Sequence, residues 1–493
     1  MSNHGSDARA PHSSHNPRSE FEPGLELALR LPRPPSSSTF AAESSLGPHN
    51  EVFASQRNET SLAPVDGGFG AWSFLAGAFL VETIVWGFPN AFGVFLQAYL
   101  QDPNISSQPH ASSVLPLAGT LSSGIIYCSG PLVNMFCGRY PIHRRTAMWI
   151  GVVLCWSSLF GASFATTVSQ LVALQGVLYA IGGSLLYTPT ISFLSEWFVR
   201  RGGLANGVVF AGTGLGGLIL PLILPPLIRA HGTSLTLRYL SIAIVAALLP
   251  VLPFVRPRLP EKRIHGPGRR NIGYSWLRSW VWWTLLVANT IQGFAHFLPI
   301  IWLPTYASLI NTSQSTSAIS VALLNGASVC SRLILGTISD RFSPRLLATS
   351  TVMGTSFITF VLWGIAGHVT AGVLVYGTMY GLFAGGWSSL WTGFVRLIAK
   401  DDPELTTSLF SFLLLSRGIG NVLSTPISTA LSMEKAPPSA HEETGFAVAG
   451  GRFEKMIVYV GTCFAGVAVI ALGAWVREIV TKKKAAMSPR MGS

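Results

Sequence analysis

The stretch Phe210–Gly217, FAGTGLGG, contains the pattern G-x-G-x-x-G, which marks the phosphate-binding turn of many dinucleotide-binding domains. Such a turn follows a strand, and an acidic residue comes about 20 positions after it. The sequence has neither feature here, because the stretch lies inside the continuous apolar run 203–227. A helix that crosses a lipid bilayer needs about 20 apolar residues. We therefore interpret this run as a membrane helix and expect no bound cofactor.

The glycines of this run recur at intervals of four residues. Gly203 and Gly207 form one such pair, and Gly212 and Gly216 form another. Small residues at this spacing let two helices approach closely in lipid, where no hydrophobic force drives them together. We predict that the four glycines form a helix-packing seam.

The composition extends this interpretation to the whole chain. Charged residues make up 11% of the 493 residues, and the mean hydropathy is +0.45. An ordinary globular protein has roughly 25% charged residues. A long chain with so little charge cannot cover itself with polar surface in water, so we expect a multi-pass membrane protein that is not an enzyme. The five cysteines show no metal-binding spacing, and we expect no metal.

Twelve apolar runs of helical length follow a polar N-terminal segment. Residues 1–70 are rich in Ser, Pro, His and Asn and lack an apolar period, which predicts a disordered tail. The approximate limits of the runs are 71–96, 112–136, 146–166, 169–190, 203–227, 236–255, 279–304, 316–338, 346–366, 370–395, 404–431 and 455–476.

The basic residues lie mainly on one side of these runs. Seven Lys and Arg residues lie in the loop 256–278, nine in the other loops on the same side and five in the C-terminal tail, against five on the opposite side. Positively charged loops stay in the cytoplasm during insertion. We expect both termini, including the tail 478–493, to be cytoplasmic, most simply at the plasma membrane. The net charge of +12 thus reflects topology and predicts no binding to nucleic acid.

The two halves of the chain resemble each other. Gly130–Phe136 stands at the end of the second run and Gly336–Phe342 at the end of the eighth, and both place a Gly six residues before a Phe. A duplication explains this pattern: a six-helix bundle 71–255, a basic cytoplasmic linker 256–278 and a second six-helix bundle 279–477. Paired bundles are typical of transporters that work by alternating access around a central site.

Several motifs resemble those of the major facilitator superfamily. Gly336–Arg341 resembles its signature loop, and Asp66–Trp72 and Trp197–Gly207 resemble two motifs of its monocarboxylate-porter branch. Gly87-Phe88-Pro89 and Arg417–Gly420 are also similar to that branch, in the style of its fungal members, which include riboflavin-transporter-like proteins. The resemblance covers about residues 64–478. It implies an all-α membrane protein of twelve transmembrane helices in two bundles, with span five meeting span eight.

Ionisable side chains inside a bilayer are costly and are therefore candidates for function. Arg332, in span eight, could hold a substrate carboxylate, and the resembling family has an arginine here; the alternative is a salt bridge or a cap on helix carbonyls. Arg417, in span eleven, could contact substrate or satisfy carbonyls at a helix interface. Glu82 could take and release a proton, or be a hydrogen-bonded group on a packed face.

Span seven carries a polar stripe on one face. Asn289, Gln292 and His296 share this face because their spacings are three and four residues. We predict that all three line the substrate cavity, with His296 as a second candidate for carrying a proton. Asn90 is a further predicted substrate contact. It stands where the animal monocarboxylate carriers have a lysine, and Ser328 stands where they have an aspartate, which puts simple lactate-type proton symport in doubt.

The remaining candidates lie in loops. By resemblance, Asp340, Arg341 and Arg139 would form gating ion pairs at the cytoplasmic ends of helices. Asn104 and Asn311 begin sequons in predicted external loops and are candidate glycosylation sites.

These observations favour a secondary active transporter of a small organic molecule, first of all a monocarboxylate or related organic acid, that could be proton-coupled. The alternatives are an importer or exporter of a neutral or bulky metabolite, such as a vitamin or secondary metabolite, and a transporter-like nutrient sensor. The expected partners are the substrate, the bilayer and a proton. The sequence leaves the direction of transport and the oligomeric state open.

Overall fold

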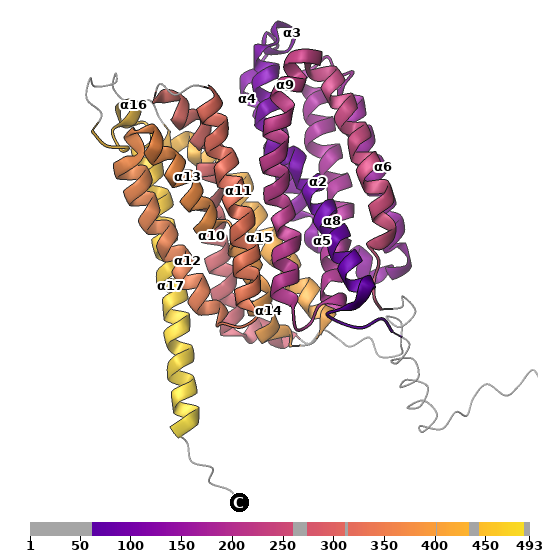
Figure 1. Cartoon of the computed structure of the whole chain (residues 1–493), viewed down its shortest axis with the longest axis vertical. Helices are drawn as coiled ribbons and strands as arrows, with labels where there is room; N and C mark the ends of the chain where they lie inside the picture. Colours follow the sequence, from indigo (N-terminus) through magenta and orange to yellow (C-terminus); the bar gives the residue numbers. More distant parts are fainter. Residues whose placement is uncertain (1–61, 260–273, 311–313, 401, 433–442, 488–493) are drawn as a thin grey trace, which may run out of the picture. The chain divides into compact units, whose positions relative to one another are not determined.

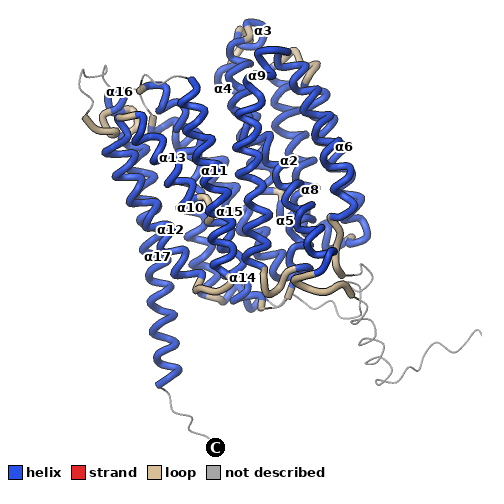
Figure 2. Tube along the Cα trace, in the orientation of Figure 1, coloured by secondary structure: helices blue, strands red, loops and turns tan. Residues whose placement is uncertain are grey.

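The computed structural model describes residues 62–259, 274–310, 314–400, 402–432 and 443–487. These residues fold into helices joined by short loops, and no strand occurs among them (Figure 2). The predicted sites and segments at 1–61, 260–273, Asn311 and 488–493 lie outside the described residues.

The N-terminal bundle comprises the helices from Gly68 to Phe254 (Figure 1). Its elements are α2 (Gly68–Gln101), α3 (Pro103–Ser106), α4 (Ala111–Cys128), α5 (Gly130–Arg139), η1 (Pro141–His143), α6 (Arg144–Ala162), α7 (Val168–Leu171), the π-helical η2 (Val172–Leu178), α8 (Tyr179–Trp197), α9 (Gly202–Val251) and η3 (Leu252–Phe254).

The C-terminal bundle follows the linker and contains the orange and yellow helices of Figure 1. Its elements are η5 (Tyr274–Arg278), α10 (Trp280–Leu309), α11 (Gln314–Ser339), α12 (Pro344–Ile358), the π-helical η6 (Thr359–Ile365), η7 (Ala366–His368), α13 (Thr370–Ala384), η8 (Trp387–Leu390), α14 (Trp391–Ala399), α15 (Pro403–Leu431), α16 (Val448–Gly451) and α17 (Glu454–Met487).

Each of the twelve predicted runs falls mainly on helix. By length and composition alone, eight helical segments of the described chain are long and apolar enough to cross a membrane. The difference arises partly because α9 merges the fifth and sixth runs across Gly232, whose φ of 76° breaks the helical path. The second run is divided between α4 and α5, and the tenth is divided among α13, η8 and α14. At the C-terminus, α17 extends beyond the predicted end of span twelve at residue 476 to Met487.

The two bundles meet along two pairs of helices. In one pair α9 packs against α11, and in the other α4 and α5 pack against α15. The contact between α9 and α11 is the predicted meeting of span five with span eight. We call the end of the bundles that carries Arg144, Arg201, Arg345 and Arg396 the basic end; α9 begins there.

Candidate functional site

Polar and ionisable side chains from both bundles gather near the middle of the long helices. We call this group the central polar cluster. Its members are Glu82 and Trp86 on α2, Tyr127 on α4, Tyr187 on α8, Gln292 and His296 on α10, Arg332 on α11 and Arg417 on α15. The Tyr187 hydroxyl lies within electrostatic range of Glu82, Tyr127, Arg332 and Arg417, so helices distant in sequence converge here.

Glu82 is completely buried in this cluster. Its Oε1 accepts a hydrogen bond of 2.8 Å from the Thr213 hydroxyl on α9. Its Oε2 has no hydrogen-bond partner among the described residues. Arg332 is its electrostatic partner across the bundle boundary. A buried carboxyl group with one free oxygen and a nearby cation can exchange a proton when water or substrate reaches it.

Arg332 bridges the two bundles through backbone carbonyls. Its Nη1 donates to the Phe210 carbonyl of α9 at 2.6 Å, and its Nε donates to the Gly385 carbonyl at 3.0 Å. Two of its nitrogens thus serve as ties between helices, which matches the alternative role considered for it above. The side chain is only partly buried, so the remaining nitrogen can still face a ligand.

Arg417 is buried, but fewer of its nitrogens than those of Arg332 are used in hydrogen bonds. Its Nη1 donates to Gln292 Oε1 at 2.7 Å, and its guanidinium lies over the Phe297 ring at 5.3 Å. Gln292 Nε2 has no partner among the described residues. An arginine held by one amide and one aromatic face can present its other nitrogens to an anion.

The predicted polar stripe of α10 divides into two roles. Asn289 donates to the Leu413 carbonyl and the Ser416 hydroxyl and accepts from Trp387, so its amide is fully used in joining helices. His296, in contrast, stacks on Tyr380 and keeps Nδ1 without a partner among the described residues. The structure therefore brings Gln292 and His296 to the cluster and leaves Asn289 as a packing residue.

Three aromatic residues complete the cluster. Trp86 packs on Tyr127 at 4.3 Å and on Tyr187 at 5.6 Å between ring centroids. The Trp86 indole nitrogen and the Tyr187 hydroxyl are buried and have no partner in the described chain. Sequence reasoning missed these residues, because an aromatic residue in an apolar run looks the same whether it packs or lines a site.

Asn90, which the sequence predicted as a substrate contact, is exposed, and its side-chain amide donates to the Thr213 carbonyl.

At the basic end, Asp340 on the C-terminal bundle is hydrogen-bonded to the N-terminal bundle. Its two carboxylate oxygens accept from the backbone N–H groups of Gly203 and Leu204, at 2.8 and 2.9 Å. The N-cap residue of α9, Arg201, provides no side-chain cap of its own. Asp340 thus caps a helix of the opposite bundle. Two ion pairs of the described residues, Arg144–Glu196 and Arg345–Glu478, involve neither Arg139 nor Arg341, which were implied to form gating pairs.

A second carboxylate holds the loop that leads into α9. Asp66 accepts from the backbone N–H groups of Val199, Arg200 and Arg201, at 2.9 to 3.0 Å. The sequence singled out the motif around Asp66, but its role as a backbone clamp required the fold. Glu196 was missed, and it accepts from Arg144 and from the backbone of Arg258 and Leu259.

The four seam glycines lie on two different contacts. A Cβ on Gly203 or Gly207 would collide with α11, near Gly336 and the Arg332 carbonyl. A Cβ on Gly212 would lie 2.5 Å from the Phe79 carbonyl of α2, and one on Gly216 would lie 2.7 Å from Gly87. The first pair therefore lines the boundary between bundles, and the second pair lies inside the N-terminal bundle.

Two observations concern modification and metals. Asn104 is exposed in α3, at the opposite end of the bundle from the basic end. Within the described ranges, no group of three or more His, Cys, Asp and Glu side chains could hold a metal ion.

Known proteins of one kind are similar to this chain. The model of the family described as "Major Facilitator Superfamily" matches residues 75–425. The MFS-type transporter hasB of Aspergillus fumigatus is 29% identical, covering 75% of this chain and 84% of hasB. The aspyridones efflux protein apdF of Emericella nidulans is 25% identical, covering 75% and 73%. The fujikurins efflux protein of Gibberella fujikuroi is 29% identical, covering 69% and 72%.

Solved structures show the same fold at low identity. The proton:xylose symporter XylE aligns with a TM-score of 0.62 and 13% identity, covering 82% of this chain and 95% of XylE. The fucose:proton symporter FucP of E. coli aligns with a TM-score of 0.59 and 14% identity, covering 81% and 98%. The fungal relatives are called MFS-type transporters and efflux proteins, so the comparisons support the superfamily and not the narrower monocarboxylate-porter branch.

Proposed function

The chain belongs to the major facilitator superfamily, and we propose that this multi-pass membrane transporter exports a bulky organic metabolite that carries an acidic group. The central polar cluster carries the proposal. Five buried polar atoms on three helices of both bundles have no partner among the described residues: Glu82 Oε2, Trp86 Nε1, Tyr187 OH, Gln292 Nε2 and His296 Nδ1.

The number and spread of these atoms favour a large substrate. A buried polar group without a partner costs about 1–3 kcal/mol, so the bound state is expected to satisfy several of them. Lactate has fewer polar atoms than the cluster has unpartnered ones, so a larger molecule satisfies the cluster better. The names of the efflux relatives point in the same direction. A small monocarboxylate remains the second candidate, supported by the cations Arg332 and Arg417.

The proposed mechanism couples export to protons through Glu82. Negative charge on Glu82 attracts Arg332, which is bonded to Phe210 across the bundle boundary. Protonation of Glu82 removes that attraction and loosens one tie between α9 and α11. If the basic end is cytoplasmic, as the charge distribution predicts, the present state is closed to the cytoplasm. In this state the protein would release its substrate to the outside and take up a proton from there.

Transport in proteoliposomes tests the proposal. Purified protein is reconstituted and offered lactate, benzoate and large polycyclic aromatic acids, with a pH gradient of either direction or none. We expect the large acids to move fastest, and only when the gradient drives protons the opposite way. Preferred movement of lactate would replace this proposal with the monocarboxylate reading. Binding without any flux would favour a sensor.

A further inference from the structure

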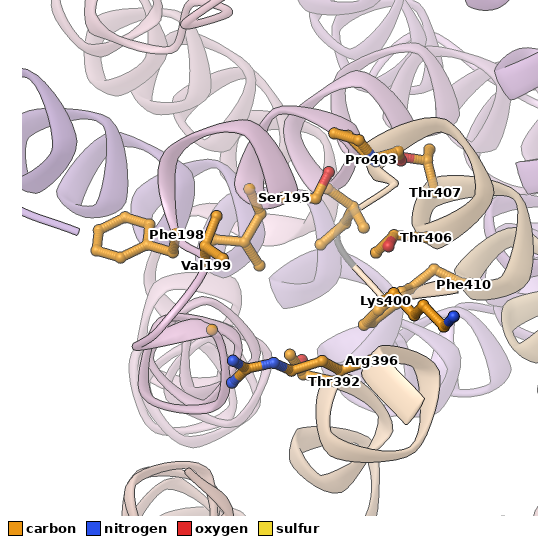
Figure 3. A pocket seen from close by; sticks show the side chains of 13 residues that line it. Ser195, Phe198, Val199, Thr392, Arg396, Lys400, Pro403, Thr406, Thr407 and Phe410 are labelled. Carbon is orange, nitrogen blue, oxygen red and sulfur yellow. The ribbon is translucent and has the colours of Figure 1, made fainter. Parts of the chain in front are cut away.

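A pocket lies at the basic end, where the two bundles meet. It is lined by Leu194, Phe198 and Val199 from the end of α8 and the loop after it, and by α14 and the first turns of α15 on the other side (Figure 3). It is separate from the central polar cluster, because none of its lining residues belongs to that cluster. The proposed transport site does not account for it.

The charges in this pocket have one sign. Arg396 and Lys400 line it, and no lining residue is acidic. Neither cation forms an ion pair among the described residues, whereas Arg144 and Arg345 at the same end are paired with carboxylates. In Figure 3 the Arg396 side chain runs past Thr392 toward the N-terminal bundle, while Lys400 lies beside Phe410.

Two further observations indicate a ligand here. The Thr392 hydroxyl is buried and has no hydrogen-bond partner in the described chain. Lys400 has a φ of 55° and a ψ of −116°, which residues with a side chain rarely adopt. A strained residue with an unpaired charge beside a buried free hydroxyl is typical of a binding site, where strain persists only because the surroundings impose it.

The size of the pocket limits the ligand. Its volume is about 70 Å³ on the scale on which one water needs about 10–15 Å³, so it holds roughly five waters. This space accepts a compact apolar ring with one charged group. The mouth is open, so a larger molecule could place such a ring inside and leave the remainder outside.

We propose that this pocket binds a compact organic anion, an aromatic carboxylate of benzoate size, whose carboxylate pairs with Arg396 and Lys400. Its ring would lie against Ile191 and Leu194 of the N-terminal bundle. A ligand that contacts both bundles binds only when they are together, so it stabilises the state in which the basic end is closed. The pocket would thus be an inhibitory site for acids, independent of the substrate that the protein carries.

Binding can be measured without a transport assay. The probe is 4-fluorobenzoate, whose ¹⁹F line broadens when it binds the purified full-length protein in nanodiscs, and 4-fluorobenzamide is the uncharged control. We expect Arg396→Gln to weaken binding about three- to fivefold, the range that a solvent-exposed ion pair provides. Ser195→Phe, which fills the pocket and keeps both cations, should remove the broadening.

Control variants distinguish binding in this pocket from binding to cations elsewhere in the protein. Arg145→Gln removes an exposed charge at the same end that does not line the pocket, and it should leave binding unchanged. Loss of binding in Arg417→Gln, with Arg396→Gln unaffected, would place the anion in the central cluster and overturn the proposal. Equal broadening of the benzamide would overturn it as well. Neither result bears on whether the protein exports a metabolite.

Discussion

Removal of the Asp340 carboxylate should open the basic end of the molecule. In Asp340→Ala, the backbone N–H groups of Gly203 and Leu204 lose their acceptor, and α9 has no cap from its own sequence to replace it. The bundles separate there only if these bonds break, so their energy contributes to the balance between the closed and open states. The fold of each bundle does not depend on them.

The magnitude follows from capping energetics. Replacing an N-cap side chain by alanine costs about 0.5–2 kcal/mol, and a charge at a helix N-terminus contributes about 0.3–1 kcal/mol. Because Asp340 is exposed, we take about 1 kcal/mol for the pair of bonds. That energy shifts the ratio of open to closed molecules about fivefold, since 1.4 kcal/mol is a factor of ten. Asp340→Asn, which keeps one oxygen acceptor but no charge, should lie between the wild type and the alanine variant.

The assay is pulsed electron–electron resonance between spin labels at the basic end. Ile142 and Leu397 are exposed and lie one in each bundle, so labels there report the separation, after the five native cysteines have been replaced. The matched control is Asp402→Ala. Asp402 caps α15 in the same way, through the N–H groups of Glu404 and Leu405, but within its own bundle.

We expect the long-distance population to rise about fivefold in Asp340→Ala and to stay unchanged in Asp402→Ala, by the capping energy above. The Asp340 effect should shrink in 0.5 M salt, which screens an exposed charge. An equal rise in both variants would show that general loss of stability, and not the cap across the boundary, controls the opening. No rise in either would refute the reasoning.

Three further predictions concern the middle of the molecule. Glu82→Gln should reduce flux driven by a pH gradient at least tenfold while substrate exchange without a gradient continues; equal loss of both would indicate a packing role. Gly207→Ala places a Cβ against the Arg332 carbonyl and should disfavour the closed state of the bundles by about 1–3 kcal/mol. Gly93→Ala is the control: a Cβ there meets no atom within 4 Å, so thermal unfolding should show unchanged or slightly raised stability. Arg417→Gln should raise the KM for anionic substrates about tenfold, which corresponds to the loss of one charge-assisted hydrogen bond, and leave the KM for neutral substrates unchanged. An equal rise in KM for both kinds of substrate would show that Arg417 does not bind the anion.

The sequence predicted the helices well because hydropathy and charge are summed over long windows. The run 203–227 needed no knowledge of its neighbours to be recognised as a membrane helix, and the basic loops indicated which helix ends lie together. The merged helix α9 departs from the prediction only because Gly232 ends one span and starts the next without a loop. The superfamily that the motifs indicated is confirmed, whereas the relatives, called MFS-type transporters and efflux proteins, do not support the narrower monocarboxylate-porter branch.

Partners of individual polar groups were harder to predict. The resemblance implied that Asp340 forms a gating ion pair with an arginine. Its partner is the start of α9, whose free N–H groups appear only once the fold brings the two bundles together. Asn289 and His296 show the same limit: both lie on one face of α10, but only the contacts reveal that Trp387 and Ser416 use up the amide of Asn289.

The two glycine pairs of α9 show where the bundles can move relative to each other. An α-helix turns about 100° per residue, so Gly203 and Gly212, nine residues apart, point in opposite directions. Gly212 and Gly216 join α9 to α2, where Glu82 and Asn90 also bond to Thr213. The linkage of α9 to α2 lies within one bundle, and that of α9 to α11 crosses between bundles. The α11 side depends on close glycine packing, the carbonyl bond of Arg332 and the cap from Asp340, contacts that can break without unfolding either helix. The predicted seam between the bundles therefore includes Gly203 and Gly207, and Gly214 and Gly217 continue it along α9 against Ser328 and Asn325 of α11. Gly212 and Gly216 instead hold α9 to α2 within the N-terminal bundle.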